Sequence, residues 1–325
     1  MISKPAYSVF LNMFTTRADR FCTTGYSSAR SISQQFDLVR KLENISAVDV
    51  VAFSDEDLQV VSKELARGDI QLASVLPDIT CDPIYQHGAF TAPDLRIRRK
   101  AIEKVCRCMD FAAAHGCNSV TIWPGQDGYD YLFQSNYLEV YSMLQAGLEE
   151  CASYRGDVTL HIEYKPYEPR THSYLDSCTS VLALLQSMGK ENMGVVIDFG
   201  HTLMSNRSPA EAVALCHAHG VDRLHLHLND SYAHMDDDLI PGTTHTLYYL
   251  EFFYWLRHLG YKGFITFDQF PYREDAVEAV TEARRWLDIL WDRVTRMDEE
   301  EVQAILRRRD GIAASRLMRD VLFGA

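Results

Sequence analysis

The sequence predicts a single (β/α)8 barrel of the TIM type followed by a C-terminal helical extension. Short β-branched or apolar segments alternate with amphipathic helical segments along most of the 325 residues. Glycines such as Gly116, Gly220 and Gly260 stand where a helix would end before the next strand. Because parallel strands need crossover connections, this alternation predicts a parallel sheet, and eight such units fit a closed barrel better than an open sheet.

The expected elements follow one another in regular order. Strands are predicted at residues 7–13, 48–53, 71–76, 119–123, 158–163, 194–198, 223–229 and 263–268. Helices are predicted at residues 33–42, 55–66, 101–114, 138–153, 178–188, 210–218 and 248–259. No glycine-rich phosphate-binding motif follows the first strand, which disfavours a nucleotide-binding sheet. We expect the barrel to occupy residues 1–292 and a charged helical extension to occupy residues 293–325.

Composition narrows the possible partners. The net charge of −13 disfavours nucleic acid, because proteins that bind phosphate backbones normally carry a basic surface. No apolar run approaches the length of a membrane span, and the N-terminus does not resemble a signal peptide. The eight cysteines form no CxxC pair and are expected to be free thiols. A cytoplasmic address without membrane contact is therefore expected.

Four successive predicted strands end in side chains that can bind metal ions. In a barrel, the functional side chains project from the last residues of the strands and from the loops that follow. Taken singly, each acid has an ordinary explanation, such as an ion pair between Glu163 and Lys165 or a helix cap at Asp198. The four predicted ligands at one rim are Glu163, Asp198, His227 and Asp268.

A second group of ligands is predicted close to the first. His201 follows Asp198 by three residues, and the loop after the seventh strand contains Asp236, Asp237 and Asp238. Such a loop could simply be solvated, but a bound dication would turn the repulsion among its acids into attraction. His201, Asp236 and Asp238 are therefore predicted to hold a second ion. Carboxylates with a few imidazoles favour Mn²⁺, with Mg²⁺ or Co²⁺ as alternatives, at one or two ions per subunit.

These motifs resemble the xylose isomerase-like barrel superfamily, specifically the two-metal aldose–ketose isomerases such as xylose and L-rhamnose isomerases. The ligand pattern of that branch is E-x-K, acid-x-x-H, His or Asp, D-x-D and a final Asp. In this sequence it stands as Glu163/Lys165, Asp198/His201, His227, Asp236/Asp238 and Asp268. The resemblance covers roughly residues 45–270.

The resemblance extends to the predicted sugar pocket. Phe90 and Trp123 match segments that line the pocket in xylose isomerases, so both are expected to form apolar walls. Asp57 is retained in the motif after the second strand and is expected to bind substrate. The ring-opening histidine of that motif is replaced by Ser54, which puts ring opening by that group in doubt.

The implied activity is isomerisation of an aldose to a ketose by a hydride shift. One metal ion would bind two sugar oxygens, and the second, held by His201, Asp236 and Asp238, would activate a water that moves a proton. Lys165 would polarise the carbonyl oxygen. The expected catalytic residues are Lys165, Glu163, His201 and Asp236. The ligand is expected to be a small sugar, and the family likeness implies a homodimer or homotetramer.

Other functions are compatible with the same barrel. The main alternative is a sugar 3-epimerase that uses one metal, Glu163 and an acid on the opposite face of the substrate. A DNA-repair endonuclease shares the barrel, but the negative charge and Asp238, where those enzymes tend to carry histidine, count against it. A decayed barrel that only binds sugar is disfavoured by the intact ligand set.

Overall fold

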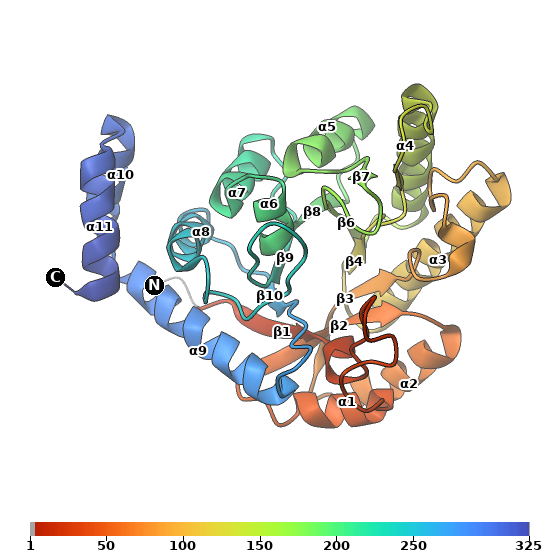
Figure 1. Ribbon diagram of the computed structural model, residues 1–325, viewed down its shortest axis with the longest axis horizontal. Helices are drawn as coiled ribbons and strands as arrows, with labels where there is room; N and C mark the ends of the chain where they lie inside the picture. The colour runs from red at the N-terminus through yellow and green to blue at the C-terminus, as the bar shows by residue number, and fades with distance from the viewer. Residues whose placement is uncertain (1–3, 325) are drawn as a thin grey trace.

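The computed structural model describes residues 4–324 and confirms the closed eight-stranded parallel barrel with surrounding helices (Figure 1). Around the barrel the strands run β1, β2, β3, β4, β6, β8, β9 and β10, and β10 pairs with β1. Their bounds are β1 Ala6–Phe10, β2 Ile45–Ala52, β3 Gln71–Pro77, β4 Ser119–Ile122, β6 Thr159–Glu163, β8 Met193–Asp198, β9 Leu224–Leu228 and β10 Phe264–Phe267.

Helices surround the barrel as the apolar spacing predicts. They are α1 Ile32–Val39, α2 Asp55–Leu65, α3 Leu95–Ala114, α4 Tyr137–Tyr154, α5 Cys178–Met188, α6 Phe199–Met204, α7 Pro209–Ala218, α8 Thr246–His258 and α9 Ala276–Thr295, with short 3-10 turns η1 Leu11–Phe14 and η2 Pro83–Tyr85. The helix expected from residue 101 begins earlier, because the Asp94 side chain accepts a hydrogen bond from the Arg96 N–H and caps α3. The first strand ends at Phe10, where η1 turns the chain at the rim.

A short antiparallel ribbon, β5 (Gly128–Tyr129) with β7 (His172–Ser173), ties the loop after β4 to the loop after β6. The pairing requires glycine, because a Cβ atom at Gly128 would collide with the carbonyl oxygen of His172. The buried Asp127 next to the ribbon accepts hydrogen bonds from the backbone N–H groups of Ala89, Phe90 and Thr91 at 3.0, 3.3 and 2.7 Å. Three rim loops are thereby held together.

The interior of the barrel is unusually polar. Barrels of this kind are normally filled by branched apolar side chains. Here several buried polar side chains of the strands hydrogen-bond to one another inside the ring. They are Ser8, Asp49, Ser74, Ser119, Thr121, His161, His225 and Thr266. Asp49, which lies fully buried on β2, accepts hydrogen bonds from several of them.

Two further helices, α10 (Glu299–Arg308) and α11 (Gly311–Phe323), form the C-terminal extension. In Figure 1 they stand beside α9, away from the mouth of the barrel. Tyr254 of α8 donates a hydrogen bond to Glu299 at 2.9 Å, which ties the extension to the barrel. Among residues 4–324, none of the helices combines the length and apolarity needed to cross a bilayer.

Candidate metal centre and sugar pocket

The four predicted metal ligands converge at the carboxyl-terminal rim of the strands. Glu163 and Asp198 are the last residues of β6 and β8, His227 lies near the end of β9, and Asp268 directly follows β10. The register of the parallel ladder places Asp198 directly beside His227. Because all four strands run parallel, their ends meet at one edge, which is why the sequence pattern predicted a shared site.

One possible ligand atom from each of Glu163, Asp198, His227 and Asp268 lies within 4.8 Å of every other. The Nδ1 atom of His227 is 3.1 Å from Glu163 Oε1 and 3.3 Å from Asp268 Oδ2. Glu163, Asp198 and His227 are buried, and the Asp268 side chain is 13% exposed. Three buried carboxylates and an imidazole at these distances fit a divalent ion with hard ligands.

The second predicted group also gathers at the mouth, but it is held by ion pairs. Asp236 Oδ2 lies 2.7 Å from Lys165 Nζ and 3.1 Å from His201 Nε2. Asp238 contacts Asn229 at 3.4 Å. Within residues 4–324, the close ligand clusters do not include His201, Asp236 or Asp238. Lys165 and His201 already engage Asp236 Oδ2, so the four-ligand cluster is the better-formed of the two predicted metal sites.

Two of the three acids in the loop after β9 line the cavity, and the third does not. Asp237 accepts hydrogen bonds from the Tyr232 N–H at 2.7 Å and from the Ser231 hydroxyl at 3.0 Å, so it stabilises its own loop. Asp236 and Asp238 line the cavity. Asp238 adopts a left-handed conformation with φ of 49°. The tight turn of this loop therefore brings Asp236 and Asp238 to the cavity while Asp237, between them, bonds to its own loop.

The shifted pKa values of the carboxyl groups at the rim indicate a place for positive charge. Burial raises the pKa of Asp198 to about 6 and raises that of Asp268 and Asp238 well above the ordinary carboxyl range, and neighbouring acids add to each shift. Burial would also raise the pKa of Asp236, but His201 and Lys165 reverse this shift and lower it. Three buried carboxyl groups thus resist ionisation, which a bound dication would relieve.

Buried polar atoms without a hydrogen-bond partner support the same interpretation. Among the described residues they include His201 Nδ1 and Asp236 Oδ1, both at the mouth of the barrel. A buried polar group that lacks a partner costs free energy, and such groups are uncommon in a folded protein. The donor set and these unpaired atoms together fit a divalent metal ion.

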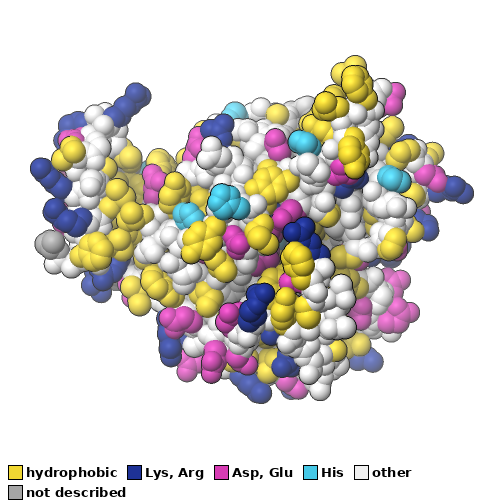
Figure 2. Space-filling view, viewed as in Figure 1, with side chains coloured by type: hydrophobic (Ala, Val, Ile, Leu, Met, Phe, Trp, Pro, Cys, Tyr) yellow, Lys and Arg dark blue, Asp and Glu magenta, His cyan; other side chains and the backbone are white. Residues whose placement is uncertain are grey.

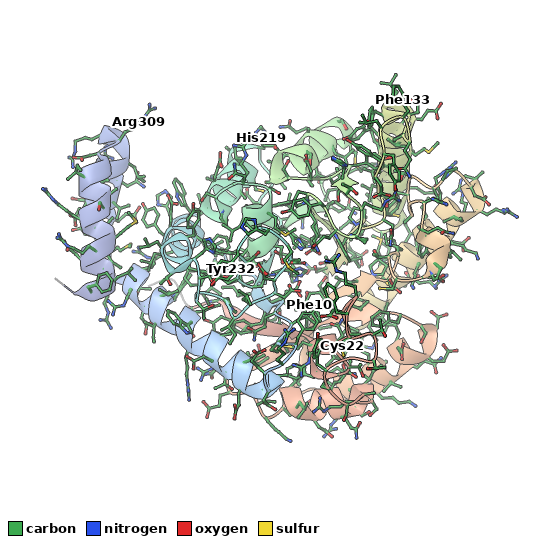
Figure 3. All side chains as sticks on the ribbon, viewed as in Figure 1. Phe10, Cys22, Phe133, His219, Tyr232 and Arg309 are labelled. Carbon is green, nitrogen blue, oxygen red and sulfur yellow. The ribbon has the colours of Figure 1, made fainter. Side chains whose placement is uncertain are left out.

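The site opens into a cavity of about 610 Å³ at the barrel mouth. Glu163, Lys165, His201, Asp236, Asp238 and Asp268 line its polar side, and Phe10, Phe53, Trp123 and Phe270 line its apolar side. Lys165 Nζ lies 5.2 Å from the Trp123 ring. Figure 3 labels Phe10 near the centre of the ring of strands, and Figure 2 shows acidic and basic side chains gathered near the middle of this face. A cavity lined by both charged and aromatic side chains suits a sugar.

Two residues expected to bind substrate lie elsewhere. Phe90 is 1% exposed, and its ring contacts the position of Gly147 in α4; it does not line the cavity. Asp57 lies in the first turn of α2 and accepts a hydrogen bond from the Ser54 hydroxyl at 2.8 Å. Ser54 caps this helix, so it has a structural role where the related motif has a histidine. Phe53, which directly precedes Ser54, is the residue of this segment whose aromatic ring lines the cavity.

The contrasting places of Phe90 and Phe53 give a testable prediction. Phe90→Leu should lower the free energy of unfolding by about 1 kcal/mol and leave KM unchanged, because it loosens the packing of the segment before α3 against Gly147 of α4. The control Phe53→Leu should raise KM and hardly affect stability, since Phe53 is 47% exposed and lines the cavity. Urea unfolding and steady-state kinetics separate the two. A raised KM in Phe90→Leu would mean that Phe90 contributes to substrate binding after all.

Asp49 and His225 contribute to the site but were not predicted from the sequence. His225 Nε2 lies 2.6 Å from Asp49 Oδ2, and His227 Nε2 lies 3.4 Å from the same oxygen. The sequence did contain a sign of Asp49, because an acid stands inside the apolar run Ala47-Val-Asp-Val-Val51. A fully buried strand tolerates such an acid only when the acid has a partner.

The sequence is similar to a known protein family and to curated enzymes. Residues 35–290 match the model of the xylose isomerase-like TIM barrel family. Xylose isomerase from Thermus thermophilus is 28% identical over 263 residues, which cover 75% of this chain and 67% of that enzyme. The match to xylose isomerase from Thermus caldophilus, at 27% identity, spans 70% of this chain and 60% of that enzyme.

Solved structures share the fold at low sequence identity. A D-tagatose 3-epimerase-like protein superposes with a TM-score of 0.68 and 19% identity, covering 89% of this chain and 99% of that one. An L-ribulose 3-epimerase superposes with a TM-score of 0.68 and 14% identity, covering 90% and 96%. At these identities the likeness establishes the barrel alone.

Proposed function

Because the chain belongs to the xylose isomerase-like TIM barrel family, we propose that it is a divalent-metal-dependent sugar epimerase that inverts the carbon next to a ketose carbonyl. The observation that carries the proposal is the four-ligand centre found among the described residues, in which Glu163 ends β6 and Asp268 follows β10, a strand that is not adjacent to β6 in the barrel. The epimerase, which the sequence suggested as the alternative to a hydride-shift isomerase, therefore becomes the favoured reaction. The sugar 3-epimerases of similar fold support this choice.

The metal centre would be formed by Glu163, Asp198, His227 and Asp268. A divalent ion there, with Mn²⁺ the preferred candidate, would supply positive charge to two neighbouring sugar oxygens and stabilise the negative charge that develops during proton transfer. The ligand chemistry is compatible with Mg²⁺ and Co²⁺ as well. The number of ions bound and the oligomeric state remain predictions.

The chain's own groups perform the proton transfers. One carboxylate, Glu163, would remove the proton from the carbon beside the carbonyl, and Asp268 would return a proton to the opposite face. Lys165 would donate a hydrogen bond to the carbonyl oxygen, while Asp236 holds its ammonium group in place at 2.7 Å. Trp123 and Phe53 would cover the apolar face of the sugar and exclude water.

An aldose–ketose isomerase is the second candidate. Two observations favour it: the sequence relatives are xylose isomerases, and the acid after the eighth barrel strand is the shorter Asp268, as in the isomerase pattern. The E-x-K pair Glu163/Lys165 also agrees with that pattern. In this reaction hydrogen would move directly between neighbouring carbons, without exchange with water.

Isotope exchange distinguishes the two reactions. Ketopentoses and ketohexoses are incubated in D₂O with Mn²⁺ or with a chelator, and products are followed by NMR. The proposed epimerase should form the C3 epimer carrying one deuterium at C3, only when metal is present. Formation of an aldose without deuterium would establish the isomerase instead. Failure to convert any sugar on the panel with Mn²⁺ would reject both.

A further inference from the structure

We propose that Asp49 is a positioning residue that orients His227 for metal binding. Asp49 lies on β2, on the far side of His227 from Glu163 and Asp268. The proposal rests on the metal centre described above, but it does not depend on which sugar reaction the centre supports. The proposal concerns which nitrogen of the His227 imidazole would bind the ion.

The two ring nitrogens of His227 face different groups. Nδ1 lies 3.1 Å from Glu163 Oε1 and 3.3 Å from Asp268 Oδ2, inside the four-ligand cluster. Nε2 lies 3.4 Å from Asp49 Oδ2, slightly beyond ordinary hydrogen-bond distance, and makes no hydrogen bond to the described residues. A neutral imidazole carries a proton on one nitrogen and a lone pair on the other. A proton on Nε2, directed at Asp49, therefore leaves the Nδ1 lone pair for the ion.

Asp49 is itself firmly held. His225 Nε2 lies 2.6 Å from Asp49 Oδ2, and the hydroxyls of Ser8 and Thr266 donate to Oδ1 at 3.3 and 3.0 Å. Asp49 and His227 are both fully buried. The edge of the Phe10 ring also packs against His227, with ring centroids 5.1 Å apart. The imidazole is thus held by a fixed carboxylate on one side and an aromatic ring on its face.

The cluster of Asp49, His225 and His227 could in principle hold an ion of its own, because its ligand atoms also lie within 4.8 Å of one another. The contacts favour a hydrogen-bonded support instead. The 2.6 Å separation of His225 Nε2 and Asp49 Oδ2 is a short hydrogen bond, in which a proton occupies the space between the atoms. The other Asp49 oxygen already accepts two hydroxyl hydrogen bonds.

Metal-binding histidines generally donate their second N–H to a carboxylate or carbonyl, and loss of that partner weakens metal binding about 10- to 100-fold. Asp49→Asn keeps the size of the side chain but weakens the acceptor facing two imidazoles. We therefore expect the Kd for Mn²⁺, measured from the EPR signal of free Mn²⁺, to rise about 10- to 100-fold at unchanged stoichiometry. The wild-type protein serves as the reference.

Thr121→Val is the matched control. It also removes a buried polar group from the barrel interior, where Thr121 hydrogen-bonds to Ser74 at 3.0 Å, but it does not touch the His227 support. Its Kd should match that of the wild type even if its stability falls. A folded Asp49→Asn variant with wild-type Kd would overturn the proposal. Loss of one bound ion without change in the affinity of another would make Asp49 a ligand and overturn the positioning role as well.

A measurement on the wild-type protein removes the dependence on a variant that folds. Two-bond ¹⁵N–¹H correlation spectra of the Zn²⁺-loaded protein report which nitrogen of His227 carries the proton. A proton on Nε2 supports the proposal, and a proton on Nδ1 rejects it. If the wild-type protein binds neither Mn²⁺ nor Zn²⁺, the metal centre fails together with this proposal. If metal binds while Asp49→Asn matches the wild type, only the role of Asp49 fails.

Discussion

Glu163→Gln is expected to reduce kcat about 10³-fold or more, because this carboxylate combines proton transfer with metal binding. Glu163 lies 3.1 Å from the Nδ1 atom of His227 and 3.5 Å from that of His201, at the centre of the buried cluster. The amide keeps the volume but can neither accept a proton nor carry the charge that balances an ion. Steady-state kinetics with saturating Mn²⁺ measure the loss. Retention of more than a tenth of wild-type kcat would contradict the assigned role.

The same substitution should remove the stabilisation by metal. A ligand at 100 times its Kd stabilises the native state by about 2.7 kcal/mol, so Mn²⁺ should raise the Tm of the wild-type protein and a chelator should reverse the rise. Glu163→Gln should show a much smaller rise. The control Asp237→Asn should behave like the wild type, since Asp237 stabilises its own loop through Ser231 and Tyr232. A wild-type Tm that is insensitive to divalent ions would contradict the metal centre.

The sequence predicted the barrel and the convergence of the four candidate metal ligands for a physical reason. Strands buried on both faces appear as continuous apolar runs, so a polar residue at the end of such a run marks the rim of the barrel. Glu163 and Asp198 end their strands and Asp268 directly follows one, and closure of the parallel barrel brings them together with His227. Strand direction and pairing were sufficient to predict that convergence.

Features that depend on side-chain packing could not be predicted in the same way. Phe90 belongs to a sequence motif that resembles a sugar-pocket segment, but its ring is buried against Gly147 of α4. Asp49 faces the barrel interior like its apolar neighbours, and only the closed ring places it opposite His225. The pairing of Asp236 with Lys165 depends on a loop whose turn includes a left-handed Asp238. Spacing along the chain contains little information about any of these contacts.

Lys165→Met is expected to lower kcat about 10²- to 10³-fold, the usual effect of removing one preorganised donor to a developing oxyanion. The Lys165 side chain is 7% exposed and lines the cavity, and its ammonium group lies 2.7 Å from Asp236 Oδ2. Burial would lower the pKa of Lys165, but the carboxylates of Asp236, Asp238 and Glu168 raise it above the ordinary value. The group therefore stays charged at neutral pH and acts as a donor, not as a base.

The loss should appear in kcat more than in the affinity for Mn²⁺, because Lys165 is not among the four clustered ligands. Lys190→Met is the matched control: the same substitution on an exposed lysine whose ammonium group hydrogen-bonds to Ser153, far from the four ligands in the sequence, should leave both quantities unchanged. A Lys165→Met enzyme with wild-type kcat would remove the carbonyl-polarising role. A Kd for Mn²⁺ weakened as strongly as kcat would instead mean that Lys165 supports the metal site through Asp236, because an unpaired Asp236 could then compete for the ion.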